Sequence, residues 1–377
     1  MPWKEVDMMN LKEQFVLEAR EKRIPFSRLC GKYEISRKTG YKWLKRFEDE
    51  GATGLIQRSR CPTRLKVTDE EWVVLILKTR DLFPAWGARK LRAYLANEGF
   101  ENLPSESTFN RTLKRHHRID QDDSAKRKPC IRFERSKPME LLQMDFKGHF
   151  SMENGRCHPL TVIDDHSRFA LVLKACLGET GELVKAALTE AFQEYGLPDA
   201  MTMDNGAPWR GWHPYSQSQL KIWLMKLGIR VSHSTPYHPQ TQGKDERFHR
   251  SLKEEVLRFN NFQNLEDAQE AFDYWRSIYN EKRPHEGIGL QRPIDRYQKS
   301  PRMFPQELPA VEYDEAEEVR KVQKNGVIEF MGCRAFVGEY LYKEPVAVRE
   351  TTTDGIYDVY YSKTRLKSID LSKLNKA

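Results

Sequence analysis

Acidic side chains at three places along the chain have the types and settings that metal-dependent phosphoryl chemistry uses. Asp145 lies inside the apolar segment "LQMDF", and Asp204 follows a second apolar segment in "LPDAMTMDNG". Asp245 and Glu246 begin the densely charged segment "DERFHRSLKEE". A carboxylate inside a strand is costly to bury without a partner, so Asp145 in particular needs a compensating charge.

Each of these acids, taken alone, is better explained as an ordinary solvated side chain. Together they are better explained as a metal site, because neighbouring carboxylates raise each other's pKa unless a cation neutralises them. Hard divalent cations prefer oxygen ligands. We therefore expect two Mg²⁺ (or Mn²⁺) ions, about 4 Å apart, that activate a nucleophile and stabilise the leaving oxygen of a phosphodiester.

Helix geometry distinguishes Glu246 from Asp245. Neighbours on a helix differ by about 100° in direction, so the two carboxylates cannot point at the same ions. Asp245 continues the apolar line of Phe248, Leu252 and Val256, at what we expect to be the exposed start of the helix. A carboxylate there interacts with the helix dipole, which contributes about 0.3–1 kcal/mol. Glu246 is therefore the predicted metal ligand, and Asp245 the predicted structural acid.

The segments around these acids alternate between strand and helix patterns. Residues 140–150 and 158–175 indicate strands, the second with a turn at "DDHSR", and a helix, a strand, a helix and a strand follow before the helix of Glu246. This order is typical of a ribonuclease-H-like α/β fold with a mixed sheet and helices outside it. The first and fourth strands of that fold are neighbours, which would place Asp145 beside Asp204.

Four segments carry a family resemblance: "LLQMDF", "TMDNGAPW", "STPYHPQTQGKDERFHRSL" and "YNEKRPHEGIGLQRPIDRY". They resemble the catalytic domain of bacterial insertion-sequence transposases, in the DDE superfamily that also contains retroviral integrases. The resemblance implies that Asp145, Asp204 and Glu246 form a catalytic, metal-binding triad, and that Arg250 and Lys253 contact the DNA end. The interval between Asp204 and Glu246 is longer than is usual in the family, and "WRGWHPYSQSQ" (209–219) is the expected insertion.

The segment "YNEKRPHEGIG" offers two further polar side chains, Arg283 and His285. They are either phosphate contacts near the site or residues of a packing and turn segment. The sequence favours neither reading.

The basic excess of the chain lies in its first third. Residues 1–135 hold 30 Lys and Arg against 20 Asp and Glu, an asymmetry typical of a nucleic-acid-binding arm. Helical patterns repeat twice there, and in each repeat a serine, Ser36 or Ser105, precedes a basic last helix. Two helix-turn-helix units are therefore predicted, with three-helix bundles bearing solvated basic faces as the alternative. The predicted DNA-contact residues are Arg37, Lys38, Tyr41 and Lys42 in the first unit, and Ser107, Arg111 and Lys114 in the second.

The chain is thus expected to be multidomain. The expected domains are a first helix-turn-helix domain (1–60), a second (61–135), a ribonuclease-H-like catalytic core (136–300) and a small C-terminal β-barrel (301–377). Apolar runs are too short to span a bilayer, the start lacks an apolar signal region, and the six cysteines are far apart. These features favour a cytoplasmic, nucleoid-associated bacterial protein without membrane contacts.

The function that these patterns predict is that of a transposase, which binds terminal inverted repeats and carries out metal-dependent strand cleavage and 3′-OH strand transfer. The expected partners are double-stranded DNA, both repeat and target, and further copies of the chain in a dimer or tetramer. The alternatives are a non-catalytic DNA-binding regulator derived from a transposase, and a ribonuclease-H-like nuclease. The regulator does not require three aligned acids, and the nuclease does not require two sequence-reading units.

Overall fold

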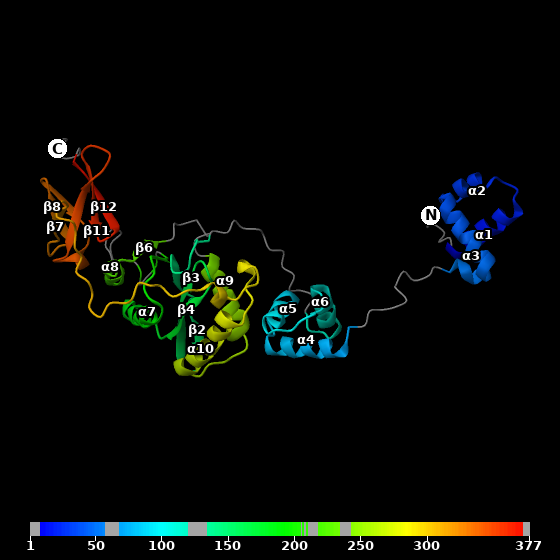
Figure 1. Cartoon of the computed structure of the whole chain (residues 1–377), viewed down its shortest axis with the longest axis horizontal. Coiled ribbons are helices and arrows are strands. Elements are labelled where there is room, and N and C mark those ends of the chain that lie inside the picture. Colours follow the sequence, from blue (N-terminus) through cyan, green and yellow to red (C-terminus); the bar gives the residue numbers. More distant parts are fainter. Residues whose placement is uncertain are drawn as a thin grey trace. The chain divides into compact units, whose positions relative to one another are not determined.

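The computed structural model describes residues 8–56, 68–119, 134–204, 206, 209, 218–233 and 243–371. The chain forms two compact units, Met1–Val67 and Thr68–Ala377, and Figure 1 labels their helices and strands. The finer division into four domains remains a prediction. Among the described residues, no helix combines the length and the apolar character that a membrane span requires.

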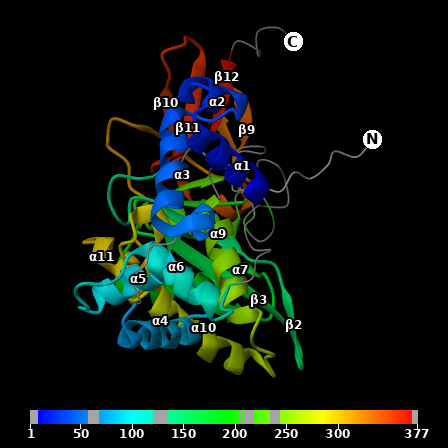
Figure 2. The same ribbon diagram turned by 90° about the vertical axis from the view of Figure 1, so that its right-hand side faces the viewer.

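The first unit packs three helices and a short 3₁₀ turn together (Figure 2). These are α1 (Met8–Glu21), α2 (Phe26–Lys32), α3 (Arg37–Glu50) and η1 (Gly51–Leu55). Ser36 caps α3, as predicted, by accepting a hydrogen bond from the Thr39 amide at 3.2 Å. Gly40 lies in the first turn of α3, where a Cβ atom would come within 2.9 Å of both Cys30 Sγ and Phe15 Cζ. The close approach of α1 and α2 to α3 therefore requires a glycine.

The second unit begins with three more helices. They are α4 (Glu70–Leu82), α5 (Ala88–Asn97) and α6 (Glu106–Arg115). Their core includes Trp86 and Phe109, and Ile278 packs against it from the helix α10 described below. Ser105 caps α6 by accepting a hydrogen bond from the Thr108 amide at 3.3 Å. Both helical regions therefore end, as expected, in a serine-capped helix that carries basic side chains.

A mixed sheet forms the centre of the second unit. Its strands are β1 (Leu142–Phe146), β2 (Phe150–Met152), β3 (Gly155–Asp164), β4 (Ala170–Cys176), β5 (Ala200–Met203) and β6 (Arg230–His233). The order is β2-β3-β1-β5-β6, with β4 also paired to β3. β1 is antiparallel to β3 and parallel to β5. The expected alternation of strands and helices is observed, with the short strand β2 as an addition.

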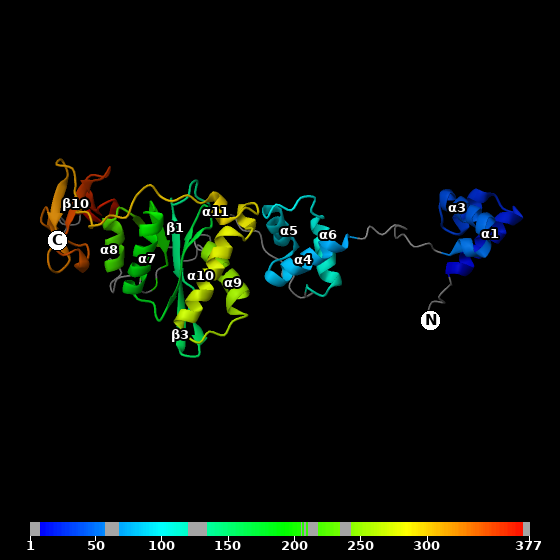
Figure 3. The same cartoon turned by 60° about the horizontal axis from the view of Figure 1, so that its bottom comes forward.

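Helices cover both faces of this sheet (Figure 3). One face carries α7 (Gly181–Tyr195) and α8 (Gln219–Lys226); the other carries α9 (Gly243–Leu252), the π-helical turn η4 (Lys253–Leu257) that continues it, and α10 (Leu265–Glu281). Leu142 and Met144 belong to the first core, and Ile163 and Leu173 to the second. Because both faces are buried, the strands read as apolar runs, with Asp145 as an interruption.

The C-terminal region is β-rich and follows η5 (Glu286–Ile288) and α11 (Pro293–Arg296). Strands β7 (Glu318–Lys321), β10 (Pro345–Glu350), β11 (Ile356–Tyr361) and β12 (Thr364–Asp370) form one sheet; β8 (Val327–Phe330) and β9 (Cys333–Phe336) form a hairpin before η6 (Glu339–Leu341). The described strands form an open sheet and a hairpin, so the expected closed barrel is not observed. Ile222 and Met225 of α8 pack into the core of this region.

Candidate active site

Asp145 and Asp204 are brought together by adjacent parallel strands. The register between β1 and β5 pairs Gln143 with Thr202. Continued by two residues, this register brings Asp145 level with Asp204, the residue that follows β5, and the Asp204 charge acts on the Asp145 carboxyl group. Asp204 directly follows β5, and its Oδ1 accepts a hydrogen bond from the Gly206 amide at 2.9 Å. The sheet therefore positions both carboxylates at the same edge.

The environment of Asp145 is short of positive charge. Burial and, next, the Asp204 carboxylate raise the pKa of Asp145 to about 7, and Glu179 and Glu246 add to the rise. A buried acid among other acids keeps its charge only when a cation is near. The acidic side chains whose charges act on Asp145 offer carboxylate oxygens, which are the ligands that Mg²⁺ and Mn²⁺ prefer.

Glu246 lies on the first turn of α9 with its side chain exposed. Its charge reaches Asp145, whose pKa it helps to raise. Within the described ranges, no three His, Cys, Asp or Glu side chains are gathered closely enough to hold a metal ion as they stand. The structure thus brings Asp145 and Asp204 close together, and Glu246 lies exposed on the surface near them.

Asp245 differs from the sequence-based expectation. Its side chain is 1% exposed, and neither carboxylate oxygen has a hydrogen-bond partner among the described residues. Burial, with Asp145 and Asp165 as further causes, raises the pKa of Asp245 well above its usual range. The expectation of an exposed acid is wrong because α9 packs on the sheet from its first turn onward, continuing the buried line of Phe248 and Leu252.

His249 connects α9 to the sheet beside Asp145, and no sequence pattern pointed to it. Its Nε2 lies 2.9 Å from Thr161 Oγ1, and its Nδ1 lies 4.0 Å from Asp145 Oδ2. Thr161 Oγ1 already donates its only hydrogen to the Asp145 carbonyl oxygen, at 3.0 Å. Nε2 must therefore carry the imidazole proton, which leaves the Nδ1 lone pair facing Asp145. Burial and the Lys147 charge lower the pKa of His249 to about 4, in agreement with a neutral ring.

Positive charge gathers just beyond these acids. Lys147 lies two residues after Asp145 and is half-buried; burial and, next, the Lys253 charge lower the pKa of Lys147. Arg250 and Lys253, the basic residues expected at the DNA end, are both exposed. In the described part of the chain, neither Lys147 nor Lys253 has an ion-pair partner.

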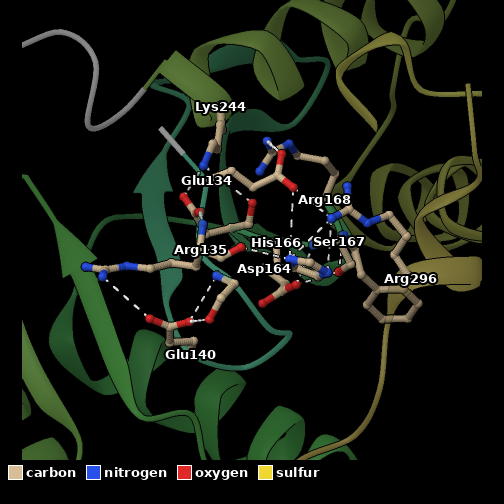
Figure 4. Close-up of polar contacts among 12 residues, drawn as sticks. Glu134, Arg135, Glu140, Asp164, His166, Ser167, Arg168, Lys244 and Arg296 are labelled. Atoms are coloured by element: carbon tan, nitrogen blue, oxygen red, sulfur yellow. Dashed lines mark hydrogen bonds and ion pairs between the residues drawn. The ribbon is translucent and has the colours of Figure 1, made fainter. Parts of the chain in front are cut away.

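A buried polar network holds the turn between β3 and β4 (Figure 4). Asp165 is fully buried and accepts hydrogen bonds from Gln143 Nε2 and the Arg135 amide, both at 2.8 Å. It also pairs with Lys244. Because Lys244 precedes Glu246 by two residues, this ion pair ties the start of α9 to the turn.

The same network extends to the segments on either side. Glu134 pairs with Arg168 at 3.0 Å and with Arg296 of α11 at 2.7 Å. Arg296 Nη2 in turn lies 3.1 Å from His166 Nε2. The sequence pattern of "DDHSR" indicated only a turn, and it did not predict these contacts. The available signal was a run of charged residues between two apolar strands, which has to be buried with partners.

The segment after α10 is a packing and turn segment. Arg283 is 3% exposed and pairs with Glu255 of η4 at 2.8 Å, so the reading of Arg283 as a phosphate contact is wrong. His285 Nδ1 accepts a hydrogen bond from the Gly287 amide at 3.2 Å, as in a turn. Both contacts are those of a packing and turn segment.

The expected DNA-contact residues of the helical regions lie on exposed faces. Those on α3 are Arg37, Lys38, Tyr41 and Lys42, and those on α6 are Ser107, Arg111 and Lys114. Tyr41 stacks on Phe26 with ring centroids 4.2 Å apart, and Arg111 donates to Thr108 Oγ1 at 3.2 Å. Of the expected insertion, residues 210–217 lie outside the described residues. Trp209 is buried and stacks on Phe146, with centroids 5.5 Å apart.

Family models match successive parts of the chain. A helix-turn-helix domain model matches residues 11–62, and a homeodomain-like domain model matches residues 39–113. Integrase core domain models match residues 135–239 and 227–293. The C-terminal domain of IS481 family transposases matches residues 317–377.

Similar proteins come from insertion elements. The insertion element IS407 uncharacterized 31.7 kDa protein of Burkholderia multivorans is 27% identical over 42% of this chain and 55% of its own length. The insertion element IS476 uncharacterized 39.2 kDa protein of Xanthomonas euvesicatoria is 28% identical over 41% of this chain and 43% of its own length. The chain thus spans about half the length of these relatives, and 10% of the Pro-Pol polyprotein of simian foamy virus type 3.

Among solved structures, one chain of the simian T-cell lymphotropic virus intasome in complex with PP2A regulatory subunit B56 gamma is 16% identical, with a TM-score of 0.39. The match covers 78% of this chain and 99% of that chain.

The family models match the chain in the same order as the regions that the structure shows. Helix-turn-helix models fall on the helical regions, integrase core models on the α/β core, and the transposase C-terminal model on the C-terminal sheet. Together with the insertion-element relatives, they support the resemblance of this chain to the bacterial insertion-sequence transposases of the DDE superfamily.

Proposed function

We propose that this chain is the enzyme that moves its own insertion sequence. It binds the terminal inverted repeats, cleaves a DNA strand at each end of the element and joins the freed 3′-OH to target DNA. One observation carries the proposal: the β1–β5 register brings Asp145 level with Asp204 in a partly buried site, where burial and the Asp204 charge raise the pKa of Asp145 to about 7. A protein that only binds DNA gains nothing from holding two carboxylates together at such cost.

Asp145, Asp204 and Glu246 are proposed to hold two Mg²⁺ (or Mn²⁺) ions. The residues fit such ions because their donors are carboxylate oxygens and because the histidine facing Asp145 is neutral, so no protein charge compensates that acid in the described chain. When bound, divalent ions activate the attacking water or 3′-OH and stabilise charge on the leaving oxygen.

The chain's own side chains set the geometry of the reaction. Asp145 and Asp204 are fixed by the sheet, so they define where the reacting phosphate binds. Glu246 completes the site from α9, whose first turn is anchored by the pair of Lys244 with Asp165. His249 holds α9 against β3 and leaves the charge of Asp145 for a cation.

The exposed basic faces of α3 and α6 are proposed to read two parts of each inverted repeat, and Arg250 and Lys253 to contact the DNA end. In this division, residues 1–60 and 61–135 bind DNA, 136–300 form a ribonuclease-H-like core, and 301–377 form the C-terminal domain. Both ends of the element must be held together for paired transfer, so we expect a dimer or tetramer on DNA. The proposed setting is the bacterial cytoplasm, at the nucleoid.

The test uses the full chain and DNA that carries the ends of its element. With Mg²⁺, the wild-type protein should cleave at the ends and transfer the 3′ strands, and EDTA should abolish both steps. Glu246→Gln should bind the repeats as tightly as the wild type but lose at least about 100-fold in cleavage rate. Glu254→Gln, the same change at an exposed acid on η4, should keep its activity. A wild-type protein that binds the repeats without any metal-dependent cleavage would instead be a DNA-binding regulator.

A further inference from the structure

We infer that Lys147 and Lys253 together bind one backbone phosphate of the DNA end, next to the phosphate that reacts. The inference rests on the proposed function, because it assigns a DNA contact of that same site. Lys253 is one of the basic residues expected at the DNA end. Lys147 belongs to the segment of Asp145, and no sequence pattern pointed to it.

The helix α9 and the strand β1 run side by side in the same direction. Near the start of α9, Lys244 and Gln143 both contact Asp165. Further along both elements, His249 Nδ1 lies 4.0 Å from Asp145 Oδ2. Residue numbers therefore rise in the same direction along β1 and along α9, so the strand and the helix are parallel.

The same spacing brings Lys253 to the level of Lys147. Four residues along a helix advance about 6 Å, and two residues along a strand advance about 6.6 Å. One such step beyond the contact of His249 with Asp145 leads to Lys253 on the helix side and to Lys147 on the strand side. The two ammonium groups act on each other electrostatically, and Lys147 also acts on His249. The contacts therefore place both lysines at one end of the acidic site.

Two ammonium groups in this position repel each other and lack a compensating charge. Neither has an ion-pair partner in the described ranges, although Lys147 is half-buried. The Lys147 backbone is fixed, because its amide donates to the Pro159 carbonyl oxygen at 3.0 Å. Lys253 begins the π-helical turn η4, a feature that is often found at functional sites. An anion between the two side chains would relieve their repulsion.

The anion that fits is a phosphate of the DNA strand. Lys147 lies one strand repeat, about 6.6 Å, beyond Asp145, a step comparable with the spacing of neighbouring phosphates along a DNA strand. Ammonium groups bind phosphate as point charges without demanding one orientation. A phosphate bound between Lys147 and Lys253 is therefore next, along the DNA strand, to the reacting phosphate at Asp145 and Asp204.

The test replaces single phosphates with neutral methylphosphonates, one at a time, at the positions flanking the reacting phosphate. Binding of the full chain is measured in Ca²⁺, so that the affinity is read without turnover. The wild type should lose about 10-fold in affinity at one flanking position. Lys147→Gln and Lys253→Gln should each bind the unmodified DNA end about 10-fold more weakly than the wild type. For these variants, a methylphosphonate at the sensitive position should cause no further loss of affinity. Each variant should also lower the slope of log Kd against log salt by about 1.

Two further variants separate the phosphate contact from a structural role. Lys147→Arg keeps the charge and should keep both the methylphosphonate effect and the salt slope. Lys185→Gln removes an exposed lysine from α7, which packs on the opposite face of the sheet, and should resemble the wild type. If Lys147→Gln shows the wild-type methylphosphonate profile and salt slope, the inference is wrong. Because these are binding measurements, they decide the phosphate site even if the wild type proves unable to cleave DNA.

Discussion

The Nδ1 atom of His249 lies 4.0 Å from Oδ2 of Asp145, while the Nε2 atom of the same ring contacts Thr161 at 2.9 Å. Since Thr161 donates its hydrogen to the Asp145 carbonyl oxygen, the ring presents a lone pair to the carboxylate. The histidine therefore joins α9 to β3 without supplying charge to the site. Burial and the Asp204 carboxylate therefore raise the pKa of Asp145 with no opposing charge from this ring.

Thr161→Val should destabilise the Thr68–Ala377 unit by about 1–3 kcal/mol. Valine has the shape of threonine, but it leaves Nε2 of His249, whose side chain is 13% exposed, without its acceptor. Urea unfolding of the full chain, followed by tryptophan fluorescence, measures the difference. Thr189→Val is the matched control: its hydroxyl donates to the Lys185 carbonyl oxygen on the exposed side of α7, so its effect should stay within about 0.5 kcal/mol. Equal losses in the two variants would contradict the assigned role of Thr161.

Asp245→Asn should be at least as stable as the wild type at pH 8 in EDTA, and it should retain most of the cleavage activity in Mg²⁺. Burial raises the pKa of Asp245 well above its usual range. A group of this kind contributes stability below its unfolded pKa, and the contribution is lost as the pH rises toward its folded pKa. Asparagine needs no proton and avoids this loss. Strong destabilisation, or a loss of cleavage as large as that of Glu246→Gln, would show that the Asp245 carboxylate has a different role.

Lys90 of α5 should make the stability of the second unit depend on pH. Its side chain is 8% exposed; burial and, next, the Arg283 charge lower the pKa of Lys90 to about 8. An unfolded lysine keeps its proton up to about pH 10.4. Between about pH 8 and 10.4 the unfolded state therefore binds more protons, and stability rises with pH. Below pH 8, Lys90 is protonated in both the folded and the unfolded state. The full cost of burying the charged side chain, on the order of 3 kcal/mol, then lowers the free energy of unfolding.

Lys90→Met keeps the apolar stem and removes the charge. At pH 7 it should raise the free energy of unfolding by up to about 3 kcal/mol, and it should flatten the rise between pH 8 and 10. Urea unfolding at several pH values measures both effects. Lys78→Met, at an exposed position of α4, should produce neither. A wild type whose stability is constant over this pH range would show that Lys90 keeps its proton in the folded protein.

The sequence determined the order of the elements and the setting of Asp145 and Asp204. Both acids interrupt or end apolar runs, and apolar periodicity is a local property that survives without knowledge of the fold. The helix caps at Ser36 and Ser105 were predictable for the same reason, because a cap involves residues three positions apart. The adjacency of Asp145 and Asp204 needed one step more, the strand order that the alternation of elements implies.

The tertiary structure alone decided which side chains meet across elements. Asp245 is buried because packing of Phe248 and Leu252 fixes how α9 lies on the sheet, and no local pattern reports that tilt. The contact of His249 with Thr161 and the proximity of Lys147 to Lys253 depend on the alignment of α9 with two strands far away in the sequence.

The same limit explains one choice that the sequence left open and one expectation that was not confirmed. Arg283 is buried because Glu255 of η4 pairs with it. The expected barrel is not observed, because the described edge strands β7 and β12 do not pair with each other. A burial pattern shows that a side chain needs a partner. Only the packing of distant elements decides which partner it has.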